Sequence, residues 1–467
     1  MTAVTTLQVA VVGSGPAGIY TAEALIKQAA KLDPPATVQV DVLDRLPTPY
    51  GLVRYGVAPD HPSIRSIADY LRNVLEDSSV RFLGGVHLGD DVTREDLLAS
   101  YDAVVYATGA MRDRRMGIPG EDLPGSYAAT DFVNWYCGHP DSDAGAFTLD
   151  AESVAVVGVG NVAVDVARIL VRDPAELRRT DIPQSVLEAL MASKVREVHM
   201  IGRRGPAQAK FTTKELRELG ELSGVDIVIH PDELDLDRFD PTGQSAQLAE
   251  SDRRVRGNLA VIQDWAAREP AGAERRLTVR FWLRPVEIDG TERLSGLTVE
   301  RTRLDEQGKF TGTGEFETIG AQMVFRSVGY QSVPLPGVPF DERSYTVPNA
   351  DGRVLGRRGA PLPGEYVAGW LKRGPTGVVG TNKSDAAGTV RSLLADLATG
   401  GGGPARRQSR DEFVAQLAQR GVRPVSYADW LRVEQAEAEL ASSLGRGERV
   451  KIGDRVAIEA LCRPPAG

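Results

Sequence analysis

The stretch Gln8-Val9-Ala10-Val11-Val12-Gly13-Ser14-Gly15-Pro16-Ala17-Gly18 decides the fold of this 467-residue chain. Its apolar, β-branched beginning is typical of a buried parallel strand, and a helical pattern follows the glycines to about Ala30. In such a unit the first glycine makes the tight turn, the second lets the backbone approach a pyrophosphate, and the third lets the helix pack closely on the strand. The helix N-terminus then faces the anion with free N–H groups. We therefore predict a dinucleotide site at residues 13–18.

A second unit of the same kind follows about 145 residues later, counted from Gln8 to Ser153 (153 − 8). Its strand is predicted at residues 153–157, its turn is Gly158-Val159-Gly160-Asn161-Val162-Ala163, and its helix runs to about Val171. Ala163 takes the place of the third glycine, where a small residue is tolerated. Two such units predict an α/β chain with two doubly wound, Rossmann-like dinucleotide-binding domains.

The order of the remaining patterns predicts that the second domain is inserted into the first. Predicted strands at 101–106 and 323–327 each end in a glycine-containing turn, and the second unit lies between them. We expect the first domain to comprise 1–109 and 329–467, and the second 110–328. The segment 173–194 is expected to be helical and to lie on the surface. Gly400 to Pro404 predicts a linker, and a helical tail is expected beyond it, at 411–419 and 427–444.

The residues that end the next strand differ between the two units. Residues 37–43 predict a strand that ends in Asp44, where a carboxylate would accept hydrogen bonds from a ribose. The strand at 197–201 ends instead in Gly202-Arg203-Arg204-Gly205. Two planar guanidinium groups suit a 2′-phosphate, which they bind bidentately. We therefore assign the first site to FAD and the second to NADP. The alternatives are a solvated carboxylate for Asp44 and a solvated basic turn for the arginines.

A third glycine-rich segment, from Gly374 to Thr381, follows a predicted strand at 365–369 and Trp370. A helix predicted at 381–397 begins there. Its N-terminus, if aimed at the pyrimidine end of a flavin, would stabilise negative charge on the reduced ring. The alternative is an ordinary glycine-rich loop.

Composition excludes several classes of protein. The net charge of −9 argues against a general nucleic-acid binder. No apolar run approaches the length of a membrane span, and no signal peptide is recognisable, so we expect a cytoplasmic protein. Cys137 and Cys462 are the only cysteines, and the five histidines show no metal-ligand spacing. A redox-active Cys-x-x-Cys pair and an internal iron–sulfur cluster are therefore excluded, and we expect no metal site.

These features resemble the adrenodoxin-reductase-like ferredoxin–NADP reductases, and most closely their actinobacterial members. The resemblance covers nearly the whole chain. The stretches that carry it are Pro47-Thr48-Pro49-Tyr50-Gly51-Leu52-Val53-Arg54, Gly56-Val57-Ala58-Pro59-Asp60-His61-Pro62, Ile118-Pro119-Gly120-Glu121-Asp122-Leu123-Pro124-Gly125, Asn161-Val162-Ala163-Val164-Asp165-Val166-Ala167-Arg168, Gly202-Arg203-Arg204-Gly205-Pro206, Phe211-Thr212-Thr213-Lys214-Glu215-Leu216-Arg217-Glu218-Leu219 and the run from Gly369-Trp370 to Asn382-Lys383.

The resemblance implies roles for residues at matching positions. Contacts to FAD are implied for the first glycine turn with Ala17, and for Asp44, Leu52, Leu88, Trp370, Gly377, Val378 and Val379. Contacts to NADP are implied for Arg114, the turn from Gly158 to Val162, Arg203, Arg204 and Glu215, and Gly377 is implied to lie near NADP as well. His61 and Glu218 match a histidine and a glutamate implicated in the hydride and proton steps. The alternatives are a residue at a helix N-terminus for His61 and a solvated helix face for Glu218.

The implied activity is transfer of hydride from NADPH to FAD, followed by single-electron transfer to a ferredoxin-type iron–sulfur protein, such as one upstream of a cytochrome P450. Arg253, Arg254 and Arg256 are candidates for a basic docking patch, with a solvated charged loop as the alternative. Two other functions stay open: an NADPH-dependent reductase of quinones or other small acceptors, and a nucleotide-sensing binding module. The acceptor and the oligomeric state are not encoded in these motifs.

Overall fold

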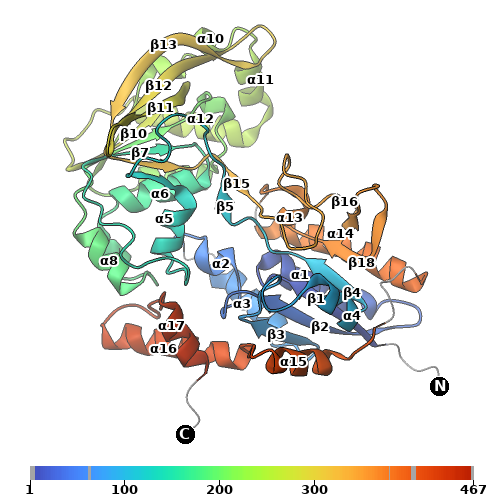
Figure 1. The fold of residues 1–467 in the computed structure, drawn as a ribbon. Coiled ribbons are helices and arrows are strands. Elements are labelled where there is room, and N and C mark those ends of the chain that lie inside the picture. The colour runs from blue at the N-terminus through green and yellow to red at the C-terminus, as the bar shows by residue number, and fades with distance from the viewer. Residues whose placement is uncertain (1–5, 62–64, 378, 401–405, 464–467) are drawn as a thin grey trace. The chain divides into compact units, whose positions relative to one another are not determined.

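Two β-sheets of mainly parallel strands organise the chain, one in each of two units (Figure 1). The computed structural model describes residues 6–61, 65–377, 379–400 and 406–463. Unit 1 comprises Met1–Arg112, Cys137–Asp141 and Tyr330–Gly467, and unit 2 comprises Asp113–Tyr136 and Ser142–Gly329. The chain thus leaves unit 1 and returns to it twice.

Unit 1 is built on a seven-stranded sheet of order β16-β17-β18-β4-β1-β2-β3. The five strands from β18 to β3 are parallel, and β16 and β17 form an antiparallel edge. The strands are β1 (Thr6–Val12), β2 (Thr37–Asp44), β3 (Val80–Gly84), β4 (Ala103–Tyr106), β16 (Asn349–Ala350), β17 (Arg353–Leu355) and β18 (Pro361–Val367). The helices are α1 (Pro16–Ala29), α2 (Leu52–Tyr55), α3 (Arg65–Leu75), α4 (Arg94–Ser100), α13 (Trp370–Arg373), α14 (Val379–Ala398), α15 (Arg410–Gln419), α16 (Tyr427–Ser443) and α17 (Arg455–Cys462).

The two-residue period of β1 divides the interior of unit 1 into two cores. Val9 and Val11 lie in a core that also contains side chains of α1, α14, α16 and α17. Ala10 and Val12 lie in another core with side chains of α4, α13 and α15. The tail helices therefore contribute to both faces of the sheet. Burial of each large apolar side chain contributes about 1.5–3 kcal/mol, so the tail is a structural part of this unit.

Unit 2 contains an all-parallel six-stranded sheet of order β6-β14-β7-β8-β10-β9 and a separate three-stranded antiparallel sheet. The parallel strands are β6 (Ser126–Ala128), β7 (Ser153–Val157), β8 (Glu197–Ile201), β9 (Val225–Ile229), β10 (Arg275–Arg280) and β14 (Met323–Arg326). The antiparallel strands are β11 (Leu283–Gly290), β12 (Leu294–Leu304) and β13 (Phe310–Gly320). The helices are α5 (Ala129–Tyr136), α6 (Asn161–Val171), α7 (Pro174–Leu177), α8 (Gln184–Met191), η2 (Pro206–Gln208), α9 (Thr213–Gly220), η3 (Pro231–Leu234), α10 (Leu236–Phe239), α11 (Gln244–Ser251) and α12 (Arg253–Ala266). The short strands β5 (Arg112–Asp113) and β15 (Tyr330–Gln331) lie where the chain changes units.

The strand orders confirm the predicted doubly wound α/β class. In unit 1, β1 lies between β2, the next strand along the chain, and β4, a later strand. In unit 2, β7 likewise lies between β8, the next strand, and β14, a later strand. This reversal of strand order is the topological switch point, and ligands of such sheets bind at the carboxyl ends of the strands beside it.

Three details differ from the sequence predictions. The segment 173–194 does not lie wholly on the surface, because Leu177, Ile182 and Val186 of this segment are buried. The strand predicted at 365–369 ends at Val367, because Gly369 has a φ of +72° and turns the chain. The linker expected at 400–404 lies, apart from Gly400, outside the described residues. In the described ranges, no helix is both long enough and apolar enough to cross a bilayer.

A buried ion pair joins the tail to helix α2, which follows β2. The Arg54 guanidinium donates to both carboxylate oxygens of Glu437, over 2.5 and 3.2 Å. Their side chains are 3% and 0% exposed, respectively. The Arg54 guanidinium carbon also lies 4.7 Å from the ring centroid of Trp430. The Lys451 ammonium donates to the backbone carbonyl oxygen of Arg54. Removing one partner of such a pair leaves the other charge buried without compensation.

We therefore expect Glu437→Gln to lower the free energy of unfolding by about 3 kcal/mol. Urea denaturation with fluorescence detection measures this change. Glu439→Gln is the matched control, because Glu439 is exposed on the same helix. Equal effects of the two substitutions would contradict the structural role of the pair.

A largely buried histidine, His139, gives unit 1 a pH dependence. The ring of His139 packs against Tyr55 at 4.9 Å, and its Nδ1 accepts a hydrogen bond from the backbone N–H of Asp141. The ring is therefore neutral, with its proton on Nε2. Burial lowers the pKa of His139 to about 4 from its usual value of 6.5. The folded state binds fewer protons at this residue than the unfolded state, so stability is full above pH 6.5 and falls as the pH falls toward 4.

Between pH 7 and pH 5, His139 is expected to account for a loss of about 2 kcal/mol in the free energy of unfolding. His139→Gln should therefore show a shallower fall than the wild type over this range. Urea titrations at several pH values compare the two slopes. Parallel slopes would show that His139 is not the responsible group.

Candidate functional site

The first glycine turn lies at the switch point of unit 1. Gly13 has a φ of +111°, and a Cβ there would lie 2.5 Å from the carbonyl oxygen of Ala107, which follows β4. A Cβ at Gly18 would lie 1.8 Å from the carbonyl oxygen of Gly13. Both positions therefore exclude any side chain for steric reasons. At Gly15 the nearest atom to an added Cβ is 3.9 Å away, so the space above this residue is open.

The N-terminus of α1 meets the requirements of an anion site. Gly15 is its N-cap and Pro16 its first residue, and no side chain caps the helix. The first N–H groups of a helix lack partners within the helix and attract anions. The open space at Gly15 therefore adjoins uncapped N–H groups, as a pyrophosphate requires.

Ser14 and Asp44 are bonded to one another. The Ser14 hydroxyl and backbone N–H both donate to Asp44, over 2.6 and 2.8 Å, and the N–H of Leu46 donates to its other carboxylate oxygen. Ser14 is fully buried and Asp44 is half-buried. Ser14 thus fixes the orientation of Asp44 at the end of β2. The Tyr50 N–H, not among the predicted site residues, donates to the Ser14 carbonyl and ties the next loop to this turn.

The segment after β18 packs directly on the first glycine turn. A Cβ at Gly369 would lie 2.5 Å from the Cβ of Ala17, so the two turns are in contact. Trp370 follows at the start of α13, with its ring centroid 5.6 Å from that of Tyr330. Its indole N–H is buried and has no hydrogen-bond partner among the described residues. Such an unpartnered buried donor is costly unless a ligand satisfies it.

The other residues predicted for this site lie at four further places in unit 1. Leu52 begins α2, and Leu88 is buried in the core that holds Ala10 and Val12. Gly377, with a φ of +82°, precedes α14, and Val379 is the first residue of that helix. Val378 lies outside the described residues. His61 is half-buried, and its N–H donates to the carbonyl oxygen of Ala58.

The glycines of the first turn predict separable effects on folding and on flavin binding. Gly15→Ala should change the melting temperature little, because its Cβ meets open space, but should reduce the bound flavin per chain at least tenfold. Gly13→Ala should lower the melting temperature strongly, through its 2.5 Å approach to Ala107. Flavin absorbance and thermal denaturation measure both quantities. Full flavin content in Gly15→Ala would argue against a pyrophosphate site at this turn.

The second glycine turn repeats this geometry in unit 2. Gly158 has a φ of +142°, and a Cβ there would lie 2.3 Å from the carbonyl oxygen of Ser327, beside the end of β14. An added Cβ at Gly160 meets nothing within 4 Å, and Gly160 is the N-cap of α6 with no side-chain cap. Val162 is half-buried in the first turn of α6. The second turn therefore also combines open space with uncapped helix N–H groups.

The elements beside the second turn converge on it. The Asn161 side chain accepts from the N–H of Thr212, and the Thr212 hydroxyl accepts from the N–H of Glu215 at the start of α9. A Cβ at Gly202 would lie 2.8 Å from a methyl group of Val159. The glycine turn, the start of α9 and the arginine turn after β8 are therefore adjacent, as the assignment of all three to one ligand requires.

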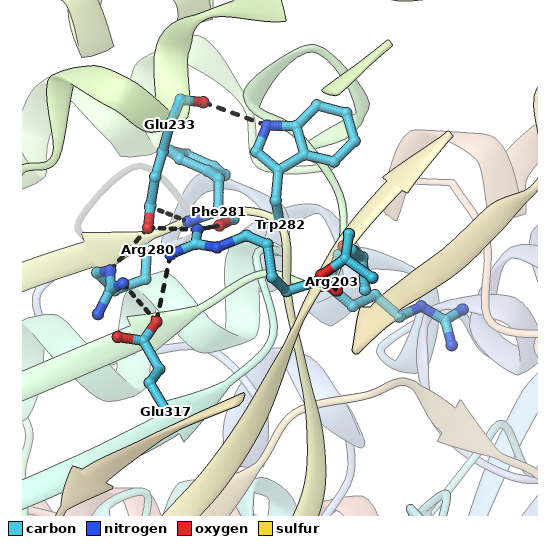
Figure 2. A network of polar contacts seen from close by, with 9 residues as sticks. Arg203, Glu233, Arg280, Phe281, Trp282 and Glu317 are labelled. Atoms are coloured by element: carbon cyan, nitrogen blue, oxygen red, sulfur yellow. Dashed lines mark hydrogen bonds and ion pairs between the residues drawn. The ribbon is translucent and has the colours of Figure 1, made fainter. Parts of the chain in front are cut away.

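Arg203 and Arg204 carry charge without a carboxylate partner in the described chain. Arg203 is exposed, and its side chain points away from the polar network behind it (Figure 2). The Arg204 guanidinium lies 4.8 Å from the ring centroid of Phe310, and its Nε is buried with no partner in the same described ranges. Desolvation, and next the charge of Arg203, lower the pKa of Arg204 below its usual value. An anion placed between the two guanidinium groups would compensate both the desolvation of Arg204 and the repulsion between the two positive charges.

Three further predictions concern other residues of unit 2. Arg114 is exposed, and its backbone N–H donates to the carbonyl of Gly329. Glu218 lies on α9, 3.6 Å from the ammonium of Lys214. Arg254 of the suggested basic patch donates to the carbonyl of Ala209, and Arg256 to that of Glu250. These last contacts favour a local structural role for the patch over a docking role.

The residues present therefore fit two nucleotides of different charge. Unit 1 offers an uncapped helix, the anchored Asp44 carboxylate and the unpartnered Trp370 N–H, which together suit a dinucleotide with an unmodified ribose and a polar ring. Unit 2 offers an uncapped helix and the arginine pair, which suit a dinucleotide that carries an additional phosphate. Phe310 was not predicted, because its contact with Arg204 depends on a strand about 100 residues away and leaves no local pattern.

Comparison with known proteins agrees with this geometry. A family model described as pyridine nucleotide-disulphide oxidoreductase matches residues 7–232. The NADPH-ferredoxin reductase FprA of Mycobacterium tuberculosis is 45% identical over 453 residues, which cover 95% of this chain and 96% of that protein. The mitochondrial NADPH:adrenodoxin oxidoreductase of Homo sapiens is 38% identical over 465 residues, covering 96% and 90%.

A solved structure of Mycobacterium tuberculosis FprA in complex with NADPH matches with a TM-score of 0.90 and 42% identity, over 98% of this chain and 99% of that one. In contrast to the disulphide enzymes named by the family model, this chain has two cysteines 325 positions apart (462 − 137), both buried. Similarity at this level along nearly the whole of both chains shows that the protein belongs to the family of FprA-type NADPH-ferredoxin reductases and NADPH:adrenodoxin oxidoreductases.

Proposed function

We propose that this protein is an NADPH-dependent ferredoxin reductase, in which unit 1 holds FAD and unit 2 binds NADPH. The electron acceptor is a ferredoxin-type iron–sulfur protein. The proposed domain assignment keeps the predicted boundaries, with 1–109 and 329–467 for FAD and 110–328 for NADPH. They differ from the two units by one to three residues at the ends and at residues 137–141, which lie in unit 1. The names of the relatives from Mycobacterium tuberculosis and Homo sapiens support the donor and the class of acceptor.

The observation that carries this proposal is the opposite charge at two equivalent places. In unit 1 the strand after the glycine turn ends in Asp44, held by Ser14. In unit 2 the equivalent strand ends before Arg203 and Arg204, which have no acidic partner in the described ranges. A carboxylate binds ribose hydroxyls and repels a 2′-phosphate, whereas a guanidinium pair binds that phosphate.

The chain's own residues would bind the two nucleotides, orient them and shield them from solvent. FAD, when bound, supplies the chemistry that joins a two-electron donor to a one-electron acceptor. Around it, the N-terminus of α1 would bind the pyrophosphate, Asp44 the ribose, and the Trp370 N–H a polar atom of the ring. The N-terminus of α14 would stabilise negative charge through its dipole. In unit 2 the N-terminus of α6 would bind the NADPH pyrophosphate.

We also propose His61 and Glu218 as the groups that act in the hydride and proton steps. Each carries a titratable side chain and lies in a stretch that resembles the family pattern. The pH profile of kcat tests this assignment, because loss of a proton-transfer group changes the profile itself. His61→Gln or Glu218→Gln variants with an unchanged profile would exclude the corresponding residue.

The donor preference provides a direct test of the arginine pair. We expect Arg204→Gln to raise the KM for NADPH at least tenfold, because a charge-assisted hydrogen bond contributes about 1.5–3 kcal/mol, and to leave the KM for NADH unchanged. Steady-state reduction of a dye with each nucleotide measures both constants. Arg256→Gln is the matched control, since Arg256 is exposed in the same unit and donates only to a backbone carbonyl. Equal KM values for the two nucleotides in the wild type would contradict the proposed NADPH site.

The acceptor is tested by comparing turnover with a ferredoxin and with a quinone at the same NADPH concentration. Ferredoxin reduction coupled to cytochrome c is expected to dominate. A much higher kcat/KM for the quinone would identify the protein as a small-acceptor reductase, with the nucleotide sites retained.

A further inference from the structure

The turn that carries Arg203 and Arg204 is held from behind by residues of β11, of β12 and of the segment between β10 and β11. The Thr302 hydroxyl donates to the carbonyl oxygen of Arg203 over 2.8 Å. The backbone N–H of Trp282 donates to the carbonyl oxygen of Arg204 over 3.2 Å, and the backbone N–H of Leu283 donates to the carbonyl oxygen of Gly202 over 3.0 Å. Three consecutive carbonyl oxygens of this turn thus accept hydrogen bonds from two later segments of the chain.

Trp282 is itself held in an unusual conformation. Its φ is +60°, in the left-handed region that residues with side chains seldom adopt, and it is fully buried. Its indole stacks on Phe239 with centroids 5.2 Å apart, and a Cβ at Gly205 would lie 2.1 Å from the indole ring. The indole N–H donates to the carbonyl oxygen of Glu233. Strained backbone persists only where the surroundings determine it, and such positions cluster at functional sites.

Behind Trp282, two carboxylates are neutralised by two other arginines (Figure 2). Glu233 accepts from Arg280 and Arg301, each over 2.9 Å, and from the N–H of Phe281. Glu317 accepts from the same two arginines, over 2.7 and 3.3 Å. Two positive and two negative charges therefore balance within this cluster. Both carboxylates are engaged, and the positive charge of Arg203 and Arg204 stays available for a ligand.

We infer that Thr302, Trp282 and Phe310 are positioning residues that hold the Arg203–Arg204 turn in the geometry that binds an adenosine 2′-phosphate. Thr302 fixes the peptide after Arg203, Trp282 packs beneath Gly205, and the Phe310 ring lies beneath the Arg204 guanidinium. Preorganised donors lose less entropy on binding than mobile ones. This inference rests on the proposed function, because it concerns the phosphate that distinguishes NADPH from NADH.

The test measures ligand binding and needs no turnover. Isothermal titration gives the Kd of adenosine 2′,5′-bisphosphate and of 5′-AMP for the flavin-loaded protein. The Kd of 5′-AMP divided by the Kd of the bisphosphate measures recognition of the 2′-phosphate, and it is larger the better that phosphate is recognised. Thr302→Val removes the hydroxyl with little change in shape and should reduce this ratio about five- to tenfold, as expected for one lost hydrogen bond. Thr302→Ser keeps the hydroxyl and should restore the ratio.

Thr298→Val is the matched control. Thr298 lies on the same strand, and its hydroxyl donates to Asp289 over 2.9 Å instead of to the arginine turn. It should keep the wild-type ratio. If Thr302→Val does not fold, Phe310→Leu decides the question, because it removes the ring beneath Arg204 at the start of β13 and should reduce the same ratio about threefold.

The outcomes separate this inference from the proposed function. A wild-type protein that binds both nucleotides equally would refute the 2′-phosphate site itself. A wild-type protein that prefers the bisphosphate, with the same ratio in Thr302→Val, Thr302→Ser and Thr298→Val, would overturn the positioning role and leave the proposed function intact. If Thr302→Val does not fold, an unchanged ratio in Phe310→Leu would likewise overturn the positioning role and leave the proposed function intact.

Discussion

Both nucleotide sites depend on one steric constraint, the contact between the first glycine of each turn and the end of a neighbouring strand. An added Cβ would lie 2.5 Å from Ala107 at Gly13 and 2.3 Å from Ser327 at Gly158. These contacts set the depth of each turn, and with it the place where the following helix begins. The helix N-terminus therefore lies at the switch point of the sheet, where its N–H groups face outward. The backbone alone thus makes each site a general anion site.

Specificity is added by side chains at the next strand end, and each set is fixed by a different means. Asp44 is oriented by direct hydrogen bonds from Ser14 and Leu46, so its support is local to the glycine turn. Arg203 and Arg204 are supported by Trp282, Thr302 and Phe310, which are far from them in sequence. Placing two arginines side by side requires more surrounding structure than placing one carboxylate. Neighbouring acidic side chains must be neutralised by other groups, because otherwise they would pair with the arginines that are to bind the ligand.

The sequence predicted what local patterns encode. The strands before both glycine turns, and β8 before the arginine turn, end at the predicted residues, because buried parallel strands and glycine turns have strong composition signals. The antiparallel sheet β11–β13 was not predicted. Its β13 is largely exposed and contains Gly312 and Gly314, so it lacks the alternation that identifies a half-buried strand.

Helix α17 has only eight residues and was likewise not predicted. The supports of the site were missed for a related reason. Thr302 and Trp282 act through contacts with Arg203 and Arg204, residues about 80–100 positions away, and a single sequence carries no record of such pairs.

The central sheet of unit 1 also imposes an order on protein synthesis. Strand β4 ends at Tyr106, whereas its parallel neighbour β18 begins at Pro361, 255 positions later (361 − 106). At about 5–20 residues per second, a ribosome needs on the order of 10–50 s to deliver that neighbour. Throughout this interval the apolar strand Ala103-Val104-Val105-Tyr106 has an open edge, which is a site for association with other nascent chains. The parallel sheet of unit 1 can therefore be completed only after all of unit 2 has been synthesised.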